Sequence, residues 1–375
     1  MVCWVLDKRE GVIGLFFVLY VVKIRTVNRL ITPDVEFCFD VLKPLSRVFS
    51  DLFVYGARDG ETIFRYLVGC CLDQTSISDY CKTHRAVSAD TVLKLGYLPL
   101  DVMTRMCNRL LEVSLGMGLK SGLFRGCSTG IDYHDVPYHG VRRDYTFKTE
   151  VKGRVRRCYR YAVASLTGNK RFSATGVQLY RQGDGNRKTV EKLLDVSPTG
   201  FDPVLMDRGF AGADVYDAVE ARGRDFITPY KICNRTDGMY KESLLDGVTV
   251  RLYPMRRNGG RWRSVYMHFV PSPEDEYHVL ASNRKDIQAR EVYRYRWGEE
   301  NLFKTLKCLR PVTSTVHESF RLLLFTVGLI LASLWKLLVR SKEHRTVKEF
   351  RKQLLAALEY HGLDSILGSR ITGFA

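Results

Sequence analysis

The spacing of apolar residues changes near residue 123 and divides the chain into parts of different character. Between residues 24 and 122 apolar side chains recur every three or four positions, as at Val102 and Met106, which predicts amphipathic helices. After residue 123 short segments rich in β-branched and aromatic residues are separated by turn residues, which predicts strands. From about residue 288 onward the helical spacing returns. The pattern therefore predicts a sheet-forming region between two helical ones.

The sheet-forming region shows an ordered series of strand-like and helix-like segments. Three strand-like segments come first, and a helix-like stretch then leads into a strand–helix–strand alternation. In chain order the segments are 126–138, 156–168, 171–183, the helix-like 187–195, 203–210, the helix-like 212–223, and 225–231. This order predicts an α/β fold in which helices pack on a mixed sheet. Residues 233–284 are polar, β-rich and full of turn residues, so we expect an insertion beside the sheet.

Residues 75–98 predict a helix-turn-helix motif inside the N-terminal helical region. Ser76 or Ser78 can cap a first short helix, a break follows around residues 85–88, and Ser88 can cap a second helix. In helix-turn-helix proteins the second helix enters the major groove of DNA. Any pair of short helices in a scaffold gives the same pattern, so DNA binding and a structural role are both open at this point.

Two apolar runs test whether the protein enters a membrane. Gly11–Val22 follows Lys8 and Arg9 as in a signal peptide, but its apolar stretch is too short to span a bilayer and no A-x-A cleavage site follows. Leu322–Leu338 approaches the spanning length, yet it contains Lys336 and has basic residues on both sides. We therefore expect a buried N-terminal helix or strand, a buried core helix, and no membrane association.

The net charge indicates the class of binding partner, and the cysteines indicate the cellular compartment. Lys and Arg number 58 against 41 Asp and Glu, which leaves a net charge of +17. Such an excess favours a polyanionic partner, more often nucleic acid than an anionic membrane. None of the ten cysteines forms a C-x-x-C pair, which argues against a zinc ribbon and a thioredoxin-type site. Scattered thiols are typical of a reducing compartment, so we expect a cytoplasmic protein.

Two aspartates follow the apolar part of predicted strands. Asp132 ends the strand-like segment GIDYHD, and Asp207 ends the short strand in VLMDRGF. Carboxylates at the carboxyl ends of neighbouring strands meet where α/β sheets bind ligands. In a basic protein such a pair suits a hard cation, Mg2+ or Mn2+. A strand-end Asp that only caps a turn is the simpler alternative.

The segment 293–309 predicts a helix with one chemically distinctive face. At about 100° per residue, five polar side chains gather on that face, four of them within an arc of roughly 60°. They are Tyr293, Arg296, Glu300 and Lys307, with Lys304 beside them. A carboxylate flanked by cations suits a site that holds a metal ion and binds a phosphate backbone. An ordinary solvated face with an ion pair between Glu300 and Lys304 gives the same pattern.

This helix face resembles the signature of a large group of insertion-sequence DDE transposases. The spacing Y-(2)-R-(3)-E-(6)-K of that group is met at every position by Tyr293, Arg296, Glu300 and Lys307. Upstream, GIDYHDVPYHG resembles the strand that carries the first Asp of the group, and VLMDRGF resembles the strand that carries the second. The resemblance covers about residues 125–340, including a β-rich stretch where these enzymes insert a β-domain.

The resemblance implies a ribonuclease H-like core with a metal-dependent active site. Asp132, Asp207 and Glu300 would be the catalytic carboxylates and would hold two divalent metal ions, Mg2+ or Mn2+. Asp135 lies close to Asp132 in the sequence and could be the first carboxylate instead.

DNA contacts around that site are also implied by the resemblance. Arg296, Lys304 and Lys307 would bind phosphates. Tyr293 would contact the backbone or a displaced base, beside the indole of Trp297. The partners would be double-stranded DNA, at the terminal inverted repeats of the element and at the target, and a second copy of the chain in a homodimer.

The function implied is cut-and-paste DNA transposition, by metal-dependent cleavage and strand transfer at the nucleoid in the cytoplasm. The expected parts are a helical region with the helix-turn-helix candidate, two parts of the catalytic core, and the β-rich insertion between them. Their bounds are 1–122 for the helical region, 123–232 and 288–375 for the core, and 233–287 for the insertion. A catalytically inactive DNA-binding relative or regulator, and a metal-dependent nuclease without strand transfer, are the alternatives.

Overall fold

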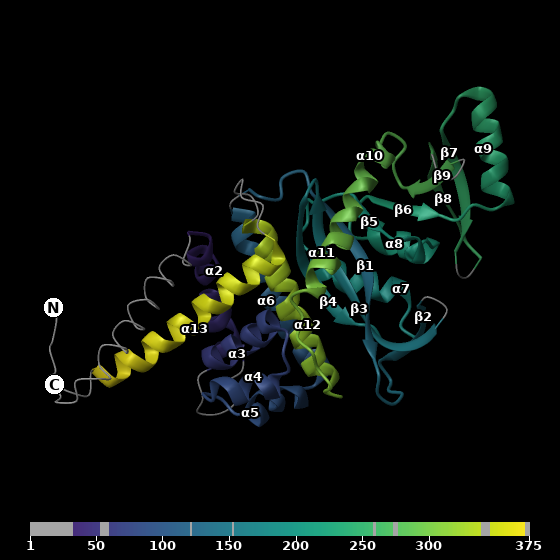
Figure 1. Ribbon diagram of the computed structural model, residues 1–375. Helices are drawn as coiled ribbons and strands as arrows, with labels where there is room; N and C mark the ends of the chain where they lie inside the picture. Colours follow the sequence, from purple (N-terminus) through teal and green to yellow (C-terminus); the bar gives the residue numbers. More distant parts are fainter. Residues whose placement is uncertain are drawn as a thin grey trace, which may run out of the picture.

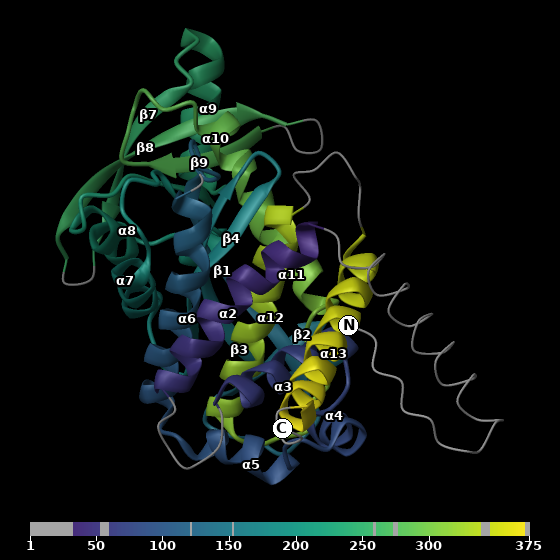
Figure 2. The same ribbon diagram turned by 90° about the vertical axis from the view of Figure 1, so that its left-hand side faces the viewer.

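The computed structural model describes residues 33–52, 60–120, 122–151, 154–257, 260–272, 277–338 and 346–371. Within these residues a nine-stranded mixed sheet runs through the protein and carries helices on both faces (Figure 1). The short helices α3 to α5 and the strands β7 to β9 lie at opposite ends of the molecule in both views (Figures 1 and 2). The predicted fold class, a mixed sheet flanked by helices, is confirmed.

The sheet is built around β1, which is antiparallel to one neighbour and parallel to the other. The strands are β1 (Ser128–Tyr138), β2 (Thr146–Val151), β3 (Arg154–Gly168), β4 (Arg171–Leu179), β5 (Val204–Met206), β6 (Phe226–Tyr230), β7 (Val250–Arg256), β8 (Trp262–Pro271) and β9 (Tyr277–Ser282). β1 pairs antiparallel with β3, and β3 with β4, whereas β1, β5 and β6 are parallel. The order β4-β3-β1-β5-β6 is consistent with the predicted ribonuclease H-like core. β2, which pairs with the first half of β3, was not predicted.

Residues 233–287 differ from the predicted β-rich insertion beside the sheet. The segment begins with a helix, α9 (Asn234–Asp246), which starts with a capping box between Cys233 and Thr236 and ends at Gly247, whose φ of 73° is left-handed. Only then do β7, β8 and β9 follow, and β9 pairs antiparallel with β6, so they continue the main sheet. The polar composition of α9 hid the helix from the sequence pattern, since only three of its residues are buried.

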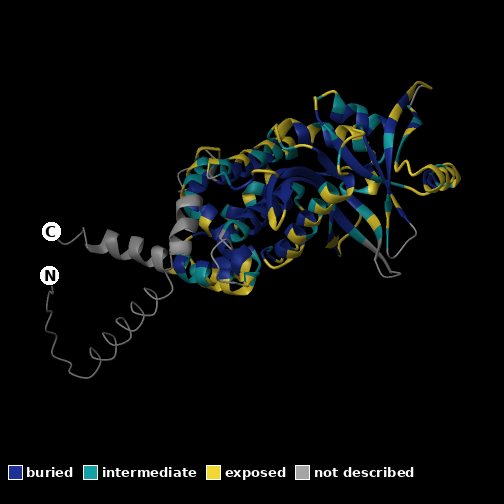
Figure 3. Ribbon diagram, turned by 90° about the horizontal axis from the view of Figure 1, so that it is seen from above, coloured by how far each residue is buried: buried dark blue, intermediate teal, exposed yellow. Residues whose placement is uncertain are grey.

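Helices cover both faces of the sheet. On one face α7 (Asn186–Val196) and α8 (Ala213–Glu220) pack against β1 and β5, in a cluster that contains Ile131, Leu193 and Met206. On the other face α6 (Leu100–Lys120) and α12 (Glu318–Leu338) cover β3 and β4. There the rings of Tyr161 and Phe325 stack with their centroids 3.8 Å apart. Figure 3 shows the buried residues concentrated between these layers.

The N-terminal helices have no separate core among the described residues. They are α2 (Pro33–Leu52), α3 (Gly60–Asp73), α4 (Ile77–His84), α5 (Ala89–Leu93), the 3-10 helix η1 (Lys94–Tyr97) and α6. Most of their buried apolar side chains belong to one cluster with those of α12, β3 and β4, and α13 (Val347–Ile371) also joins it. The helical region therefore packs as part of the same unit as the sheet.

The helix-turn-helix candidate forms the two predicted short helices, α4 and α5. The Ser76 side chain accepts a hydrogen bond from the Asp79 amide at 3.1 Å, and that of Ser88 accepts one from the Thr91 amide at 3.3 Å. The second helix has only five residues and runs directly into η1. Val92 is fully buried, and a Cβ at Gly96 would lie 2.8 Å from His317 Cβ at the start of α12. Contact of α5 with DNA stays a prediction.

The apolar run Leu322–Leu338 lies in α12, and the predicted core helix is confirmed. By length and hydropathy the span Glu318–Leu337 could cross a membrane, but 83% of its most apolar window is buried inside the protein. The amide of Ala174 in β4 donates a hydrogen bond to Ser333 Oγ at 3.1 Å, which ties the helix to the sheet. The other apolar run, Gly11–Val22, lies outside the described residues.

Candidate active site

The pairing of β1 with β5 sets two aspartates side by side. Ile131 pairs with Met206, the last residue of β5, and each is followed directly by an aspartate, Asp132 and Asp207. Because the two strands are parallel, residues that follow a register pair are neighbours. The prediction that Asp132 ends its strand was wrong, because β1 continues to Tyr138. Asp132 lies instead where the pairing with β5 ends.

The helix predicted over residues 293–309 is interrupted. α10 (Ala289–Tyr293) is followed by the 3-10 helix η3 (Arg294–Arg296), and α11 (Trp297–Lys307) begins after it. The single-helix prediction was wrong in this respect; residues 294–296 contain no Gly or Pro, and the nearest glycine, Gly298, lies in the first turn of α11. Arg296 therefore lies at the N-terminal end of α11, close to the carboxyl end of β5.

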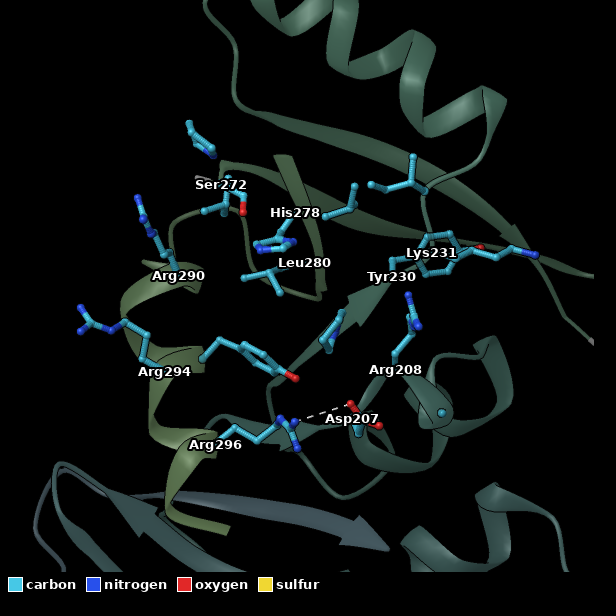
Figure 4. Close-up of a pocket in the computed structure, with 17 residues that line it drawn as sticks. Asp207, Arg208, Tyr230, Lys231, Ser272, His278, Leu280, Arg290, Arg294 and Arg296 are labelled. Carbon is cyan, nitrogen blue, oxygen red and sulfur yellow. Dashed lines mark ion pairs between the residues drawn. The ribbon is translucent and has the colours of Figure 1, made fainter. Parts of the chain in front are cut away.

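One guanidinium joins the three predicted carboxylates. Arg296 Nη1 lies 3.1 Å from Asp132 Oδ2, and Nη2 lies 3.3 Å from Glu300 Oε1 and 3.8 Å from Asp207 Oδ1. Figure 4 shows the ion pair with Asp207 at the floor of a pocket. Three acidic side chains from β1, the end of β5 and α11 thus converge on one cation.

Burial disfavours the charged forms of Asp132 and Arg296, two of the groups that meet here. Burial raises the pKa of Asp132 to about 6, although the charge of Arg296 acts in the opposite direction. Burial disfavours the charged form of Arg296 too, but Tyr293 and the carboxylates of Asp132 and Asp207 hold the pKa of the guanidinium above its ordinary value. The acidic cluster therefore depends on a cation at its centre.

The donor set has the chemistry of a site for a hard divalent cation. Carboxylate oxygens are the ligands that Mg2+ and Mn2+ prefer. Among the residues that the structure describes, no three His, Cys, Asp or Glu side chains lie close enough together to hold a metal ion. The guanidinium of Arg296 stands between Asp132, Asp207 and Glu300. The three carboxylates are therefore of the type that such an ion prefers. In this structure, however, they are spaced to pair with the guanidinium of Arg296 and not to coordinate one ion.

Asp135, the alternative first carboxylate, lies away from this cluster. Successive residues of a strand point to opposite faces, so Asp135 and Asp132 point to opposite faces of β1. Asp135 forms a bidentate ion pair with Arg160 of β3, at 2.7 and 2.8 Å. The geometry therefore groups Asp132, and not Asp135, with Asp207 and Glu300.

Glu299 is an acidic residue at the site that the sequence patterns did not single out. Its side chain is 1% exposed, accepts a hydrogen bond from Ser165 Oγ at 3.2 Å, and has no partner for Oε2 among the described residues. It lies over Gly130 of β1, where a Cβ would be 2.5 Å from its Cδ. Burial, together with the charge of Asp132, raises the pKa of Glu299 well above its usual range. The helical spacing could have revealed that Glu299 is buried. At 100° per residue Glu299 lies at about 240° from Tyr293, next to the leucines that face the core.

The predicted DNA-contact residues are divided between two places. Tyr293 lies at the carboxylate cluster, where its hydroxyl donates a hydrogen bond to the Met206 carbonyl at 3.4 Å. Trp297 and Lys304 lie together on the exposed side of α11, with Lys304 Nζ 5.8 Å from the indole centroid. Lys307 is at the far end of the helix, where its carbonyl accepts a hydrogen bond from Gln74. Only Tyr293 and Arg296 of this set adjoin the carboxylates.

A basic pocket opens beside Asp207. It has a volume of about 1100 Å³ and lies between the end of β6, the strands β8 and β9, and the segment α10–η3 (Figure 4). Its cationic lining residues come from three separate stretches of the chain and are Arg208, Lys231, Arg290, Arg294 and Arg296. Asp207 is its one carboxylate among the described residues, and Tyr230 and Tyr293 add aromatic surface. Apart from Arg296, the sequence patterns singled out none of these cations, since the sheet brings them together only in the fold.

Among the comparisons with known proteins, a family model and a solved structure match this chain. The family described as "Transposase DDE domain" matches residues 127–335. Among solved structures, the chain is similar to a piggyBac transposase in a synaptic complex with hairpin DNA, determined by cryo-electron microscopy. The identity is 12% and the TM-score 0.48, over 85% of this chain and 77% of that one. No curated protein matches the chain. Because the family match spans more than half of the sequence, the chain belongs to the family of the transposase DDE domain.

Proposed function

We propose that this protein is a DNA transposase of the insertion-sequence group with the Tyr-Arg-Glu-Lys signature, which cleaves the ends of its element and joins them to target DNA. The observation that carries the proposal is the convergence of Asp132, Asp207 and Glu300 around Arg296 beside a basic pocket. An acidic cluster in a strongly basic surface suits an enzyme that acts on phosphodiesters with metal ions.

Each part of the site has a separate task in this mechanism. Asp132, Asp207 and Glu300 would hold the divalent ions, two Mg2+ or Mn2+ per site, and these would supply Lewis-acid activation of water and of a DNA 3′-hydroxyl for in-line attack on a phosphodiester. The cations of the pocket neutralise the phosphates on either side of the scissile bond. Tyr293, anchored on the Met206 carbonyl, supplies an aromatic surface at the same place.

The partner that suits this surface is double-stranded DNA, at the terminal inverted repeats and at the target. The net charge of +17 supports strong, salt-dependent binding, because each neutralised phosphate releases counterions. Trp297 and Lys304 on the exposed side of α11, and Lys307 at its end, extend the basic surface along the helix. We also propose that two copies pair the two element ends as a homodimer, at the nucleoid in the cytoplasm.

The decisive experiment is cleavage and strand transfer on DNA that carries the inverted repeats flanking the reading frame. We expect Mg2+-dependent nicking that Glu300→Gln lowers by about a thousandfold or more, since a metal site is dismantled while the shape is kept. Asp135→Asn is the matched control, because this aspartate lies on the same strand but pairs with Arg160. Binding without cleavage by the wild type would identify an inactive relative or regulator. Cleavage without joining of 3′-hydroxyl ends would identify a nuclease.

A further inference from the structure

The guanidinium of Arg296 and a divalent cation require the same oxygen atoms. All three ion pairs of Arg296 go to the carboxylates that the proposed function assigns to metal. Its side chain is 18% exposed and that of Asp132 is 17% exposed, so their contact is largely shielded from water, whereas Asp207 and Glu300 reach Arg296 from the exposed side. Mg2+ binds carboxylate oxygens at about 2.0–2.1 Å, which brings the ligands closer together than a guanidinium between them allows. Arg296 and the metal therefore exclude each other.

We propose that Arg296 is a positioning residue that holds the three carboxylates together before metal binds and releases them when a DNA phosphate binds. Metal loading then follows DNA binding, and the protein without DNA keeps a poor metal site. The inference rests on the proposed function, because it concerns the same carboxylates.

The first argument for this role is the need for a counter-ion. Asp132 lies on β1, Asp207 follows β5, and Glu300 lies on α11, so three parts of the fold deliver negative charge to one place. Without a cation these groups repel each other and drive α11 away from the sheet. The five donors of an arginine are spread over a planar fork and can reach separated acceptors, whereas the three donors of a lysine share one nitrogen.

The second argument is that the alternative partner of Arg296 lies next to it. The same side chain lines the basic pocket beside Asp207, where a DNA backbone would lie. Arginine binds phosphate by paired charge-assisted hydrogen bonds, which compete well with those to a carboxylate. Movement of one long side chain from the carboxylates to a phosphate in the pocket is enough to free the oxygens. The backbone at η3 need not change.

This role and a purely structural role predict opposite effects on metal affinity. If Arg296 only braces the site, its loss lets the carboxylates separate and weakens metal binding. If Arg296 competes with metal, its loss strengthens metal binding in the absence of DNA.

The test is Mn2+ binding to the full chain without DNA, followed by electron paramagnetic resonance of the free ion. Arg296→Gln is compared with Arg294→Gln, which removes the same charge two residues away. Arg294 is 74% exposed, pairs with Glu291 at 3.5 Å, and points away from Asp207 in Figure 4. We expect Arg296→Gln to bind Mn2+ at least about tenfold more tightly than Arg294→Gln, since a hydrogen bond to a charged group contributes more than this factor.

A second arm adds a duplex oligonucleotide at low salt, with DNA alone as the blank. At saturating DNA the Mn2+ affinity of the wild type should rise by about tenfold, and that of Arg296→Gln should change little. Arg296→Lys, which keeps the charge but loses the fork, should give an intermediate affinity without DNA. Mn2+ should also raise the melting temperature of Arg296→Gln more than that of Arg294→Gln, which shows that both are folded.

The outcomes separate the inference from the proposed function. Equal or weaker Mn2+ binding by folded Arg296→Gln, relative to Arg294→Gln, overturns the role of Arg296 and leaves the proposed function standing. No Mn2+ binding by any variant, with or without DNA, overturns both.

Discussion

A close contact between the catalytic helix and the sheet lies at Gly130, and Gly130→Ala should disturb it. A Cβ at this position would lie 2.5 Å from both Cδ and Oε1 of Glu299. Glu299 cannot move aside easily, because it is 1% exposed and bonded to Ser165. Overpacking of this kind costs about 1–3 kcal/mol. Alanine in a strand gains roughly 0.5–1 kcal/mol over glycine, so we expect a net loss of up to about 2.5 kcal/mol in unfolding free energy.

The same substitution should affect chemistry more than stability. Glu299 adjoins Glu300 on α11, so a displacement of the first moves the proposed metal ligand. A misplacement of about 1 Å can cost on the order of a hundredfold in rate. We expect Gly130→Ala to lower DNA cleavage ten- to a hundredfold while leaving DNA affinity unchanged.

A double-variant cycle with Glu299→Ala identifies the contact as the cause. Removing the Glu299 carboxyl removes the group that the new methyl would meet, so the cost of Gly130→Ala should vanish or become a gain of about 0.5–1 kcal/mol. Urea unfolding of the four proteins measures the coupling. The same cost of Gly130→Ala in both backgrounds would refute the reasoning.

Three further outcomes are expected. Lys231→Ala should lower DNA affinity modestly for every sequence and reduce the slope of log affinity against log salt by about one, measured by fluorescence anisotropy. Chelation by EDTA should stop cleavage and leave DNA binding intact, as a gel-shift assay would show. Burial lowers the pKa of His134 to about 3, so below pH 6.5 only the unfolded chain takes up the proton and stability falls as the pH falls. Between pH 7.5 and 5 the wild type should therefore lose about 2 kcal/mol more than His134→Phe in urea unfolding, and equal losses would exclude the effect.

Local sequence patterns predicted those elements whose burial or capping depends on residues within the element itself. The strand-like segments around Asp132 and Asp207 became β1 and β5 because their apolar residues are buried on both faces of the sheet. The helical spacing placed Arg296 and Glu300 on one face, and their guanidinium and carboxylate lie 3.3 Å apart. The cap residue Ser88 also starts a helix where predicted.

The features that were missed depend on partners distant in sequence. Glu299 is buried only because Gly130 leaves space above β1. The interruption at Arg294–Arg296, which contains no Gly or Pro and has only Gly298 nearby, places Arg296 near the end of β5. Lys231 and Arg290 meet in one pocket because the start of α10 lies beside the end of β6. The pattern of a single sequence does not show which residues distant along the chain come into contact in the fold.

The common core of the N-terminal helices and α12 limits how the chain can be divided or recombined. Leu67 of α3, Leu110 of α6 and Leu329 of α12 are fully buried in one cluster. A fragment that ends near residue 122 would expose that surface to water, and the remaining catalytic part would expose the matching surface of α12. Exchange of the N-terminal region between relatives must therefore carry a compatible α12 with it.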